Sequence, residues 1–214
     1  LKEDTIMNDI KTTANPLGYE KIGKLLTSYA VPSIIALIIN SLYNMVDQIF
    51  IGQGVGFLGN GATNIIAPIA TITIAIATLF GDGLAAFFSL NLGKGKGEKA
   101  AKGLGTSIMF GSVFGIIWTV LAFAFLKPLC LIFGATENIL PYALDYGRII
   151  VIGFTFQIVG NTINSAIRTD GSPRYAMLSM MIGAVLNIIL DPIFIFVFHW
   201  GVEGAAIATI ISQL

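Results

Sequence analysis

Residues 175–200 read YAMLSMMIGAVLNIILDPIFIFVFHW, and this stretch decides the class of the protein. Its side chains are mostly apolar, and Asp191 is the only carboxylate among them. A helix of this length can cross a hydrocarbon core of about 30 Å. An Asp near the bilayer midplane costs roughly 2.5 to 3.5 kcal/mol on insertion scales, so it is rare unless it faces a partner or a wet cavity. The stretch therefore predicts a transmembrane helix with a functional carboxylate inside it.

Two neighbours of Asp191 strengthen this interpretation. Asn187 lies one helical turn earlier on the same face. Pro192 has no N–H group, so the carbonyl of Ile188 loses its usual helical donor. The spacing predicts that an amide, a carboxylate and a carbonyl meet at one place. We interpret this place as a cation or proton site inside a membrane transporter.

The composition of the whole chain agrees with a membrane protein. Its 214 residues are 55% hydrophobic and 11% charged, with a mean hydropathy of +0.84, whereas soluble domains carry about 25% charged residues. The 12 basic and 12 acidic residues balance, so no basic surface for nucleic acid is indicated. One cysteine, Cys130, and one histidine, His199, exclude an internal disulfide framework and argue against a His/Cys metal site.

The predicted fold class is all-α, a polytopic membrane protein with a six-helix transmembrane bundle. Residues 1–24 are polar and mixed in charge, which is typical of a tail, and no cleavable signal is expected. Residues 25–214 are expected to form one transmembrane lobe. Apolar runs of spanning length predict the helices at about residues 25–51, 62–92, 104–126, 139–167, 175–198 and 202–214.

Glycine and proline predict the breaks between and within these spans. We expect a glycine-rich loop at residues 52–61, a basic loop at 94–102, a loop at 127–138, and interruptions of the second span at Pro68 and at Gly81-Asp82-Gly83. The sixth span is expected to be truncated, because the chain stops inside an apolar run. Its small residues predict a close packing face, made of Gly204, Ala205, Ala206 and Ala208.

The basic residues of the short loops predict the orientation in the membrane. Ten of them lie in the tail and in loops 94–102 and 168–174, and two lie at the opposite ends of the spans. Because cytoplasmic loops carry the excess of Lys and Arg, we expect the N-terminus in the cytoplasm and a multi-pass location in the cell membrane.

Depth, counted at about 1.5 Å per residue from the span ends, brings Asp191 to the level of Asp47 and Thr209. Two nearby carboxylates cannot both ionise cheaply without a cation, so such a pair responds to protons, and hard oxygen ligands also suit Na⁺. The candidate cation site is therefore Asp47, Asn187, Asp191 and Thr209. The alternative is that these residues only hold helices together, at about 0.6 kcal/mol for each hydrogen bond.

Other polar residues in the spans leave more than one interpretation open. Asn44 continues the polar face of Asp47 toward Asn40 in the first span, and Gln157 and Asn161 form a similar stripe in the fourth. Such stripes line a cavity or pack between helices. Asp82 lies at a different depth from the candidate site, so we expect either a satisfied structural carboxylate or a local bend.

Several motifs follow one another along the chain: Pro32, LYNMVDQIFIG at 42–52, Leu92-Gly93 before the Lys-rich loop, RTDGSPR at 168–174, NIILDP at 187–192 and GAAIAT at 204–209. In this order they resemble the multidrug and toxic compound extrusion (MATE) family of secondary transporters. The resemblance covers nearly the whole chain after the tail.

The resemblance implies the N-terminal lobe of a two-lobe, twelve-helix antiporter that exports small lipophilic or cationic compounds in exchange for Na⁺ or H⁺. It implies a cation site at Asp47, Asn187, Asp191 and Thr209, and a cleft that includes Tyr146. Together with the polar stripes, this gives a candidate substrate cleft at Asn44, Tyr146, Gln157 and Asn161. The expected partners are the substrate, membrane lipid and a missing C-terminal lobe, with no nucleic acid and no cofactor besides the coupling ion.

Two alternatives come from other functional classes. A lipid-linked saccharide flippase has a related architecture, but it would favour basic residues lining the cavity for pyrophosphate, and this chain has none deep inside its spans. An intramembrane aspartyl protease using Asp47 and Asp191 would need glycine-flanked carboxyls around one water, which the sequence lacks. We therefore expect a transporter and not an enzyme.

Overall fold

A computed structural model describes residues 21–214, so the first 20 residues of the expected tail lie outside the described part. Every regular element in the described part is a helix. In chain order these are α2 (Ile22–Gly54), α3 (Phe57–Gly93), α4 (Gly97–Ala124), α5 (Leu126–Ile132), α6 (Leu140–Thr169), α7 (Pro173–Pro192), the π-helix η2 (Ile193–Val197) and α8 (Gly201–Gln213).

Five of these helical segments are long and apolar enough to cross a membrane: α2, α3, α4, α6 and α7 with η2. Large apolar side chains along them, such as Leu37 on α2 and Val120 on α4, are exposed. Exposed apolar surface of this extent is what a lipid-facing bundle requires. The prediction of an all-α polytopic membrane protein is confirmed. The sixth expected span corresponds to α8, which has 13 residues in the chain.

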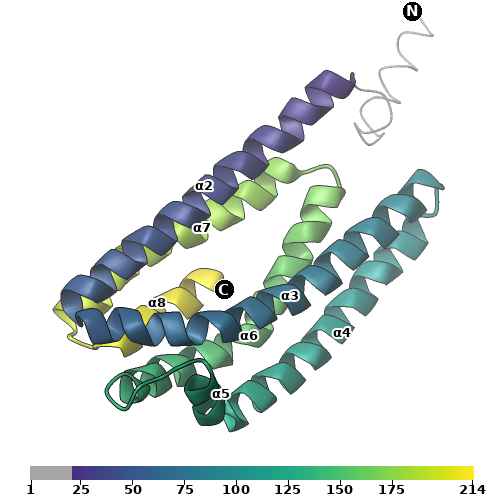
Figure 1. Ribbon diagram of the computed structural model, residues 1–214. Helices are drawn as coiled ribbons and strands as arrows, with labels where there is room; N and C mark the ends of the chain where they lie inside the picture. The colour runs from purple at the N-terminus through teal and green to yellow at the C-terminus, as the bar shows by residue number, and fades with distance from the viewer. Residues whose placement is uncertain (1–20) are drawn as a thin grey trace, which may run out of the picture.

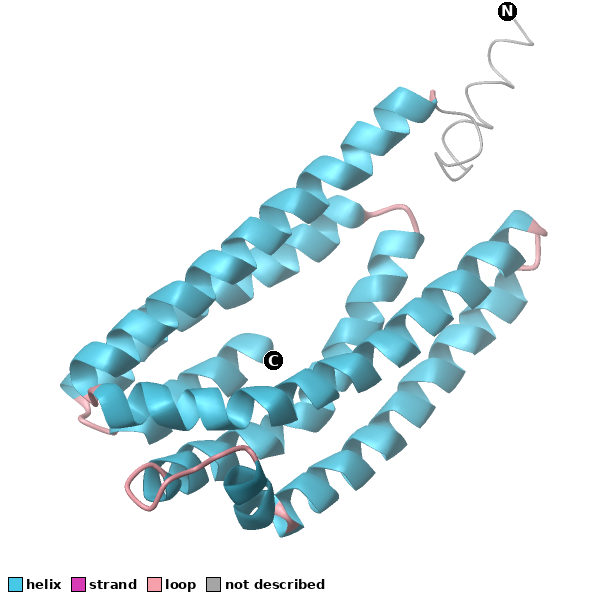
Figure 2. Ribbon diagram, in the orientation of Figure 1, coloured by secondary structure: helices cyan, strands magenta, loops and turns pink. Residues whose placement is uncertain are grey.

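The helices form two packed groups (Figures 1 and 2). α2 lies along α7, while α3 packs on α4 and α6. α2 and α3 meet at the end of the bundle where α2 turns into α3 and diverge toward the opposite end, where α6 turns into α7 (Figure 1). The short α8 lies between the two groups and contacts both α6 and α7.

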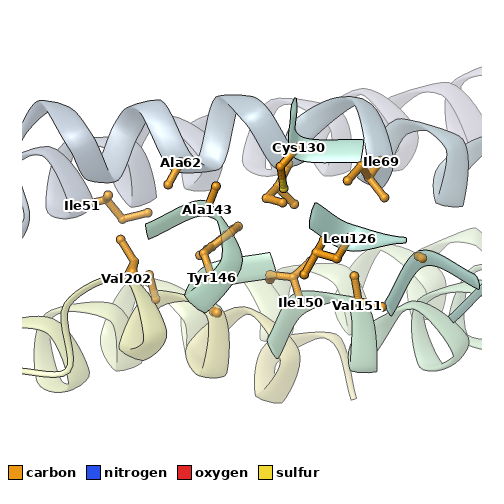
Figure 3. Close-up of a cluster of buried hydrophobic side chains, with 14 of the residues drawn as sticks. Ile51, Ala62, Ile69, Leu126, Cys130, Ala143, Tyr146, Ile150, Val151 and Val202 are labelled. Atoms are coloured by element: carbon orange, nitrogen blue, oxygen red, sulfur yellow. The ribbon is translucent and has the colours of Figure 1, made fainter. Parts of the chain in front are cut away.

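The main apolar core lies where α3, α5, α6 and α8 meet (Figure 3). Ile66 and Ile69 of α3 face Tyr146, Ile150 and other residues of α6. The small residues of α8 are buried, as the sequence predicted: Gly204, Ala205, Ala206 and Ala208. Small side chains allow helix backbones to approach closely, which brings α8 into the middle of the bundle.

The glycine-rich segment 52–61 is not the loop that the sequence predicted. α2 continues to Gly54 and α3 starts at Phe57, so only two residues separate them, and Gly56 makes the turn with a φ of 83°. The other glycines serve close packing. A Cβ on Gly59 would lie 2.8 Å from the Val55 side chain, and a Cβ on Gly61 would lie 3.0 Å from Ile139.

The expected interruptions of the second span are also wrong, because α3 runs without a break through Pro68 and Gly81-Asp82-Gly83. Gly81 instead lets α3 approach α6, since a Cβ there would lie 2.8 Å from Ser165 Oγ. Two predicted loops are partly helical as well. α4 begins at Gly97, where Glu98 pairs with Lys102 at 2.8 Å, and α5 occupies the start of the expected loop at 127–138.

The end of α7 changes its winding at the proline that the sequence singled out. The α-helix ends at Pro192, and the next five residues form the π-helix η2. Phe198 N–H donates to the carbonyl of Ile193 at 3.0 Å, the wider spacing of a π turn. Single π turns inside α-helices often mark functional sites, and this π segment begins two residues after Asp191.

Candidate cation site

Asp47 and Asp191 lie together between α2 and α7. Asp47 is 8% exposed and Asp191 is 0% exposed. Their carboxyl groups are near enough for one to donate a hydrogen bond to the other when it carries a proton. Two carboxyl groups at this range hold a shared proton or a cation between them, because two bare negative charges in contact repel strongly at low dielectric.

Asn187 completes the buried group on α7. Its Nδ2 donates to Asp191 Oδ1 at 3.2 Å, and the side chain is 1% exposed. The contact follows from the i, i+4 spacing on one helical face. Since α7 packs along α2 over much of its length, this face meets Asp47.

Within residues 21–214, three buried oxygens of this group have no hydrogen-bond partner: Asp47 Oδ1, Asn187 Oδ1 and Asp191 Oδ2. Buried polar atoms in proteins are nearly always paired, so each exception calls for an explanation. Three such oxygens on two facing helices match the ligands that a hard monovalent cation prefers. The arrangement can therefore take up a proton or a cation such as Na⁺.

Two other candidate residues, Thr209 and Tyr146, lie in surroundings that differ from those of the carboxyl pair. The Thr209 hydroxyl donates to the carbonyl of Ala205 on its own helix at 2.9 Å. Within residues 21–214 no hydrogen bond joins Thr209 to Asp47, Asn187 or Asp191. Tyr146 is 8% exposed, lies in the apolar core of Figure 3, and is within electrostatic range of both carboxyl groups.

The other candidate cleft residues lie on α2 and α6. Asn44 is exposed, and its Nδ2 donates to the carbonyl of Asn40 at 2.7 Å. Gln157 is half-buried and Asn161 is exposed. Asp82 is exposed on α3, in a continuous helix rather than at a bend.

Sequence reasoning missed a second polar group beside Asp47. Gln48 Oε1 accepts a hydrogen bond from the Thr63 hydroxyl of α3 at 3.1 Å, and its side chain lies near the Asp47 carboxyl group. Asn60 lies one turn before Thr63. Asn60 lies in the segment that the sequence predicted to be a loop, so the prediction did not place it on a helix. The signal that was available is a polar side chain, Gln48, inside an apolar span directly after the candidate Asp47.

Comparison with known proteins decides the family. A family model described as MatE matches residues 32–193, which include most of α2 and all of α7 with Asp47, Asn187 and Asp191. The chain belongs to the MatE family. This confirms the resemblance that the sequence motifs indicated.

Relatives and solved structures of the MatE family match this chain over most of its length. The multidrug export protein MepA of Staphylococcus haemolyticus is 31% identical over 196 residues, which are 90% of this chain and 42% of that protein. MepA of Staphylococcus aureus strain MRSA252 is 29% identical, over 89% of this chain and 42% of its own length.

Among solved structures, a MOP superfamily transporter from Pyrococcus furiosus superposes with a TM-score of 0.84 at 29% identity, over 89% of this chain and 42% of its own. Its structure was described with a binding pocket of reverse polarity that suggests a different function. The chain thus spans less than half the length of the curated relatives it matches. The relatives from staphylococci are named as export proteins, in agreement with the prediction that the chain is not an enzyme.

Proposed function

We propose that this chain is the cation-binding lobe of a secondary antiporter that exports small lipophilic or cationic compounds in exchange for Na⁺ or H⁺. The observation that carries the proposal is the buried pair of Asp47 and Asp191, held between two membrane-spanning helices with one open oxygen on each carboxyl group. The multidrug export named in the staphylococcal relatives supports the substrate class.

The pair gives the cation a direct influence on helix packing. Without a cation or proton, the two carboxylates repel each other across the contact between α2 and α7. Binding of Na⁺ or H⁺ removes this repulsion and favours the state in which the two helices are close. A ligand shifts a conformational equilibrium only by its differential affinity for the two states, and the changing distance between the carboxyl groups provides that difference.

The membrane potential adds to the driving force. One elementary charge that moves inward gains about 2.3 kcal/mol for each 100 mV. With the N-terminus in the cytoplasm, as the loop charges predict, the carboxyl pair lies nearer the extracellular end of α2. In this orientation the coupling ion enters from outside, and its binding is linked to release of the exported compound.

The missing half of the transporter is expected to supply the rest of the substrate cleft. In this lobe the cleft would include Asn44, Tyr146, Gln157 and Asn161, of which Asn44 and Asn161 are exposed. Asn44 lies on the same helix as Asp47, one turn away. A change at the carboxyl pair that moves α2 would therefore move this part of the cleft as well.

Cation-driven dye efflux from proteoliposomes that contain the full-length transporter tests the proposal. Asp47→Asn and Asp191→Asn should each abolish efflux driven by a Na⁺ or pH gradient while the protein still inserts. Asp82→Asn is the matched control, because Asp82 also lies in a spanning helix but is exposed and away from the pair. Efflux by either site variant at the wild-type rate would refute the proposed role.

A further inference from the structure

A second polar cluster connects the carboxyl pair to the end of the bundle where α2 turns into α3. Its members are Gln48 on α2 and Asn60 and Thr63 on α3. The Thr63 hydroxyl lies 3.1 Å from Gln48 Oε1 and 2.9 Å from the carbonyl oxygen of Asn60. Gln48 directly follows Asp47 in α2, and its side chain lies near the Asp47 carboxyl group. The cluster is thus a continuous series of polar groups that starts at the cation site.

Some acceptor oxygens of this cluster receive no hydrogen bond. Thr63 has one hydroxyl hydrogen and two acceptors within reach, so it satisfies only one of them at a time. Asn60 Oδ1 is buried and has no hydrogen-bond partner in the described part of the chain. Thr63 itself is only 7% exposed. A buried group with spare acceptor oxygens is suited to bind a cation or a proton.

The members of the cluster lie at successive depths along α2 and α3. Asn60 lies three residues and Thr63 six residues after the first residue of α3, which corresponds to about 4.5 and 9 Å along the helix. Gln48 lies six residues before the last residue of α2, level with Thr63. Asp47 lies one residue further from the end of α2 than Gln48. The polar groups therefore lead from the α2–α3 end inward to the carboxyl pair.

Apolar residues of both helices lie along the same stretch of the seam between α2 and α3. Ile51 of α2 and Ala62 and Ile66 of α3 are fully or almost fully buried and belong to one apolar cluster. A Cβ on Gly52 would lie 2.8 Å from Asn60 Nδ2. The glycine leaves room for the Asn60 amide at this point of the seam, where any larger residue would press against it.

We propose that Gln48, Thr63 and Asn60 form an entry branch, a polar route by which the coupling cation reaches Asp47 and Asp191 from the α2–α3 end. The proposal rests on the proposed function of the carboxyl pair. Neutral oxygens replace part of the water around a cation without holding it tightly. Rapid passage requires this combination, because a site must bind well enough to admit the ion and weakly enough to release it.

Removal of the Thr63 hydroxyl tests the branch in full-length transporter reconstituted in proteoliposomes. Thr63→Val keeps the shape of the side chain and removes its oxygen. We expect cation-driven dye efflux to slow about tenfold, the scale of one lost buried hydrogen-bonding group. The equilibrium affinity for the cation should stay within about twofold of wild type. The reason is that an entry route changes the rates of binding and release together. The affinity is measured with ²²Na⁺, or from the pH midpoint of efflux if protons couple.

Two further variants make the result specific. Thr63→Ser restores the hydroxyl and should restore the efflux rate. Thr71→Val is the matched control, since Thr71 is exposed on the same helix and its hydroxyl donates only to the carbonyl of Ala67 at 2.9 Å. It should transport at the wild-type rate. Asn60→Ala removes the open amide oxygen and should slow efflux as Thr63→Val does, which covers the case in which one variant fails to insert.

Two outcomes would overturn the entry branch. One is transport by correctly inserted Thr63→Val and Asn60→Ala at the wild-type rate. The other is a loss of cation affinity in Thr63→Val that matches its loss of rate, which would make Thr63 a support for Asp47 and not a route. Failure of the proposed function would be distinct, because Asp47→Asn and Asp191→Asn would then retain cation-driven efflux.

Discussion

At the scale of single residues, the Asn187 amide supports Asp191 within the buried pair. It donates to one oxygen of Asp191 at 3.2 Å, while the other oxygen has no partner. Removing a partner from a buried polar group costs about 1 to 3 kcal/mol. Asn187→Ala should therefore raise the cation concentration for half-maximal efflux by roughly tenfold or more. The measurement is a titration of efflux rate against Na⁺ and against pH.

Asn64→Ala is the matched control for Asn187→Ala. Asn64 is also an asparagine in a spanning helix, but it is exposed and donates to the carbonyl of Asn60 on its own helix at 2.9 Å. Its titration should overlay that of the wild type. An Asn187→Ala titration that did the same would show that the amide takes no part in cation binding.

At the same scale, the sequence could predict the contact between Asn187 and Asp191, because i, i+4 spacing on a helix determines it locally. The contact between Asp47 and Asp191 depends on how α2 packs along α7. Loop charges and residue depth predicted only that the two residues lie at the same depth in the membrane. The bonds that Gln48 makes across to Thr63 depend on the position of α3. No local pattern in the sequence carries that information.

At the scale of helices, the contact between α7 and α8 depends on a glycine. A Cβ on Gly183 would lie 2.5 Å from the carbonyl oxygen of Ser212, which belongs to backbone that cannot turn away. Gly183→Ala should lower the free energy of unfolding by about 1 to 3 kcal/mol, as overpacking does elsewhere. Thermal unfolding of the purified full-length protein in detergent measures the change.

Gly105→Ala should have the opposite effect on stability in the same thermal unfolding experiment. Gly105 lies inside α4, and apart from its chain neighbours and the nearby backbone of its own helix no heavy atom of residues 21–214 lies within 4 Å of its ideal Cβ. Alanine should stabilise this helix by up to about 1 kcal/mol through its higher helix propensity. Equal melting temperatures for the two variants would contradict the close α7–α8 approach.

The helices also show where sequence-based interpretation of glycine fails. The same residue type marks a turn at Gly56, where φ is 83°, and a close approach at Gly59 and Gly81 inside α3. Composition alone cannot separate these uses, because both exploit the missing side chain. The expected loop at 52–61 and the expected break at Gly81-Asp82-Gly83 were wrong for this reason.

At the scale of the whole molecule, the loop charges predict that the α3–α4 turn faces the cytoplasm and the α5–α6 segment faces outside. Single cysteines at exposed positions test this. Thr136→Cys in intact cells should react with a membrane-impermeant maleimide, and Lys96→Cys should react only after the membrane is opened. The native Cys130 is buried and should remain unlabelled. Labelling of Lys96→Cys in intact cells would reverse the orientation.

The central claim is that Asp47 and Asp191 bind the coupling cation, and carbodiimide modification of the full-length transporter tests it most directly. Carbodiimides react with protonated carboxyl groups in apolar surroundings, and mass spectrometry locates the product. We predict modification at Asp47 or Asp191 that Na⁺ suppresses at constant pH if Na⁺ couples, or that falls with rising pH at the same midpoint as efflux if protons couple. Modification of the pair that Na⁺ leaves unchanged, with a pH midpoint that differs from that of efflux, would contradict the account.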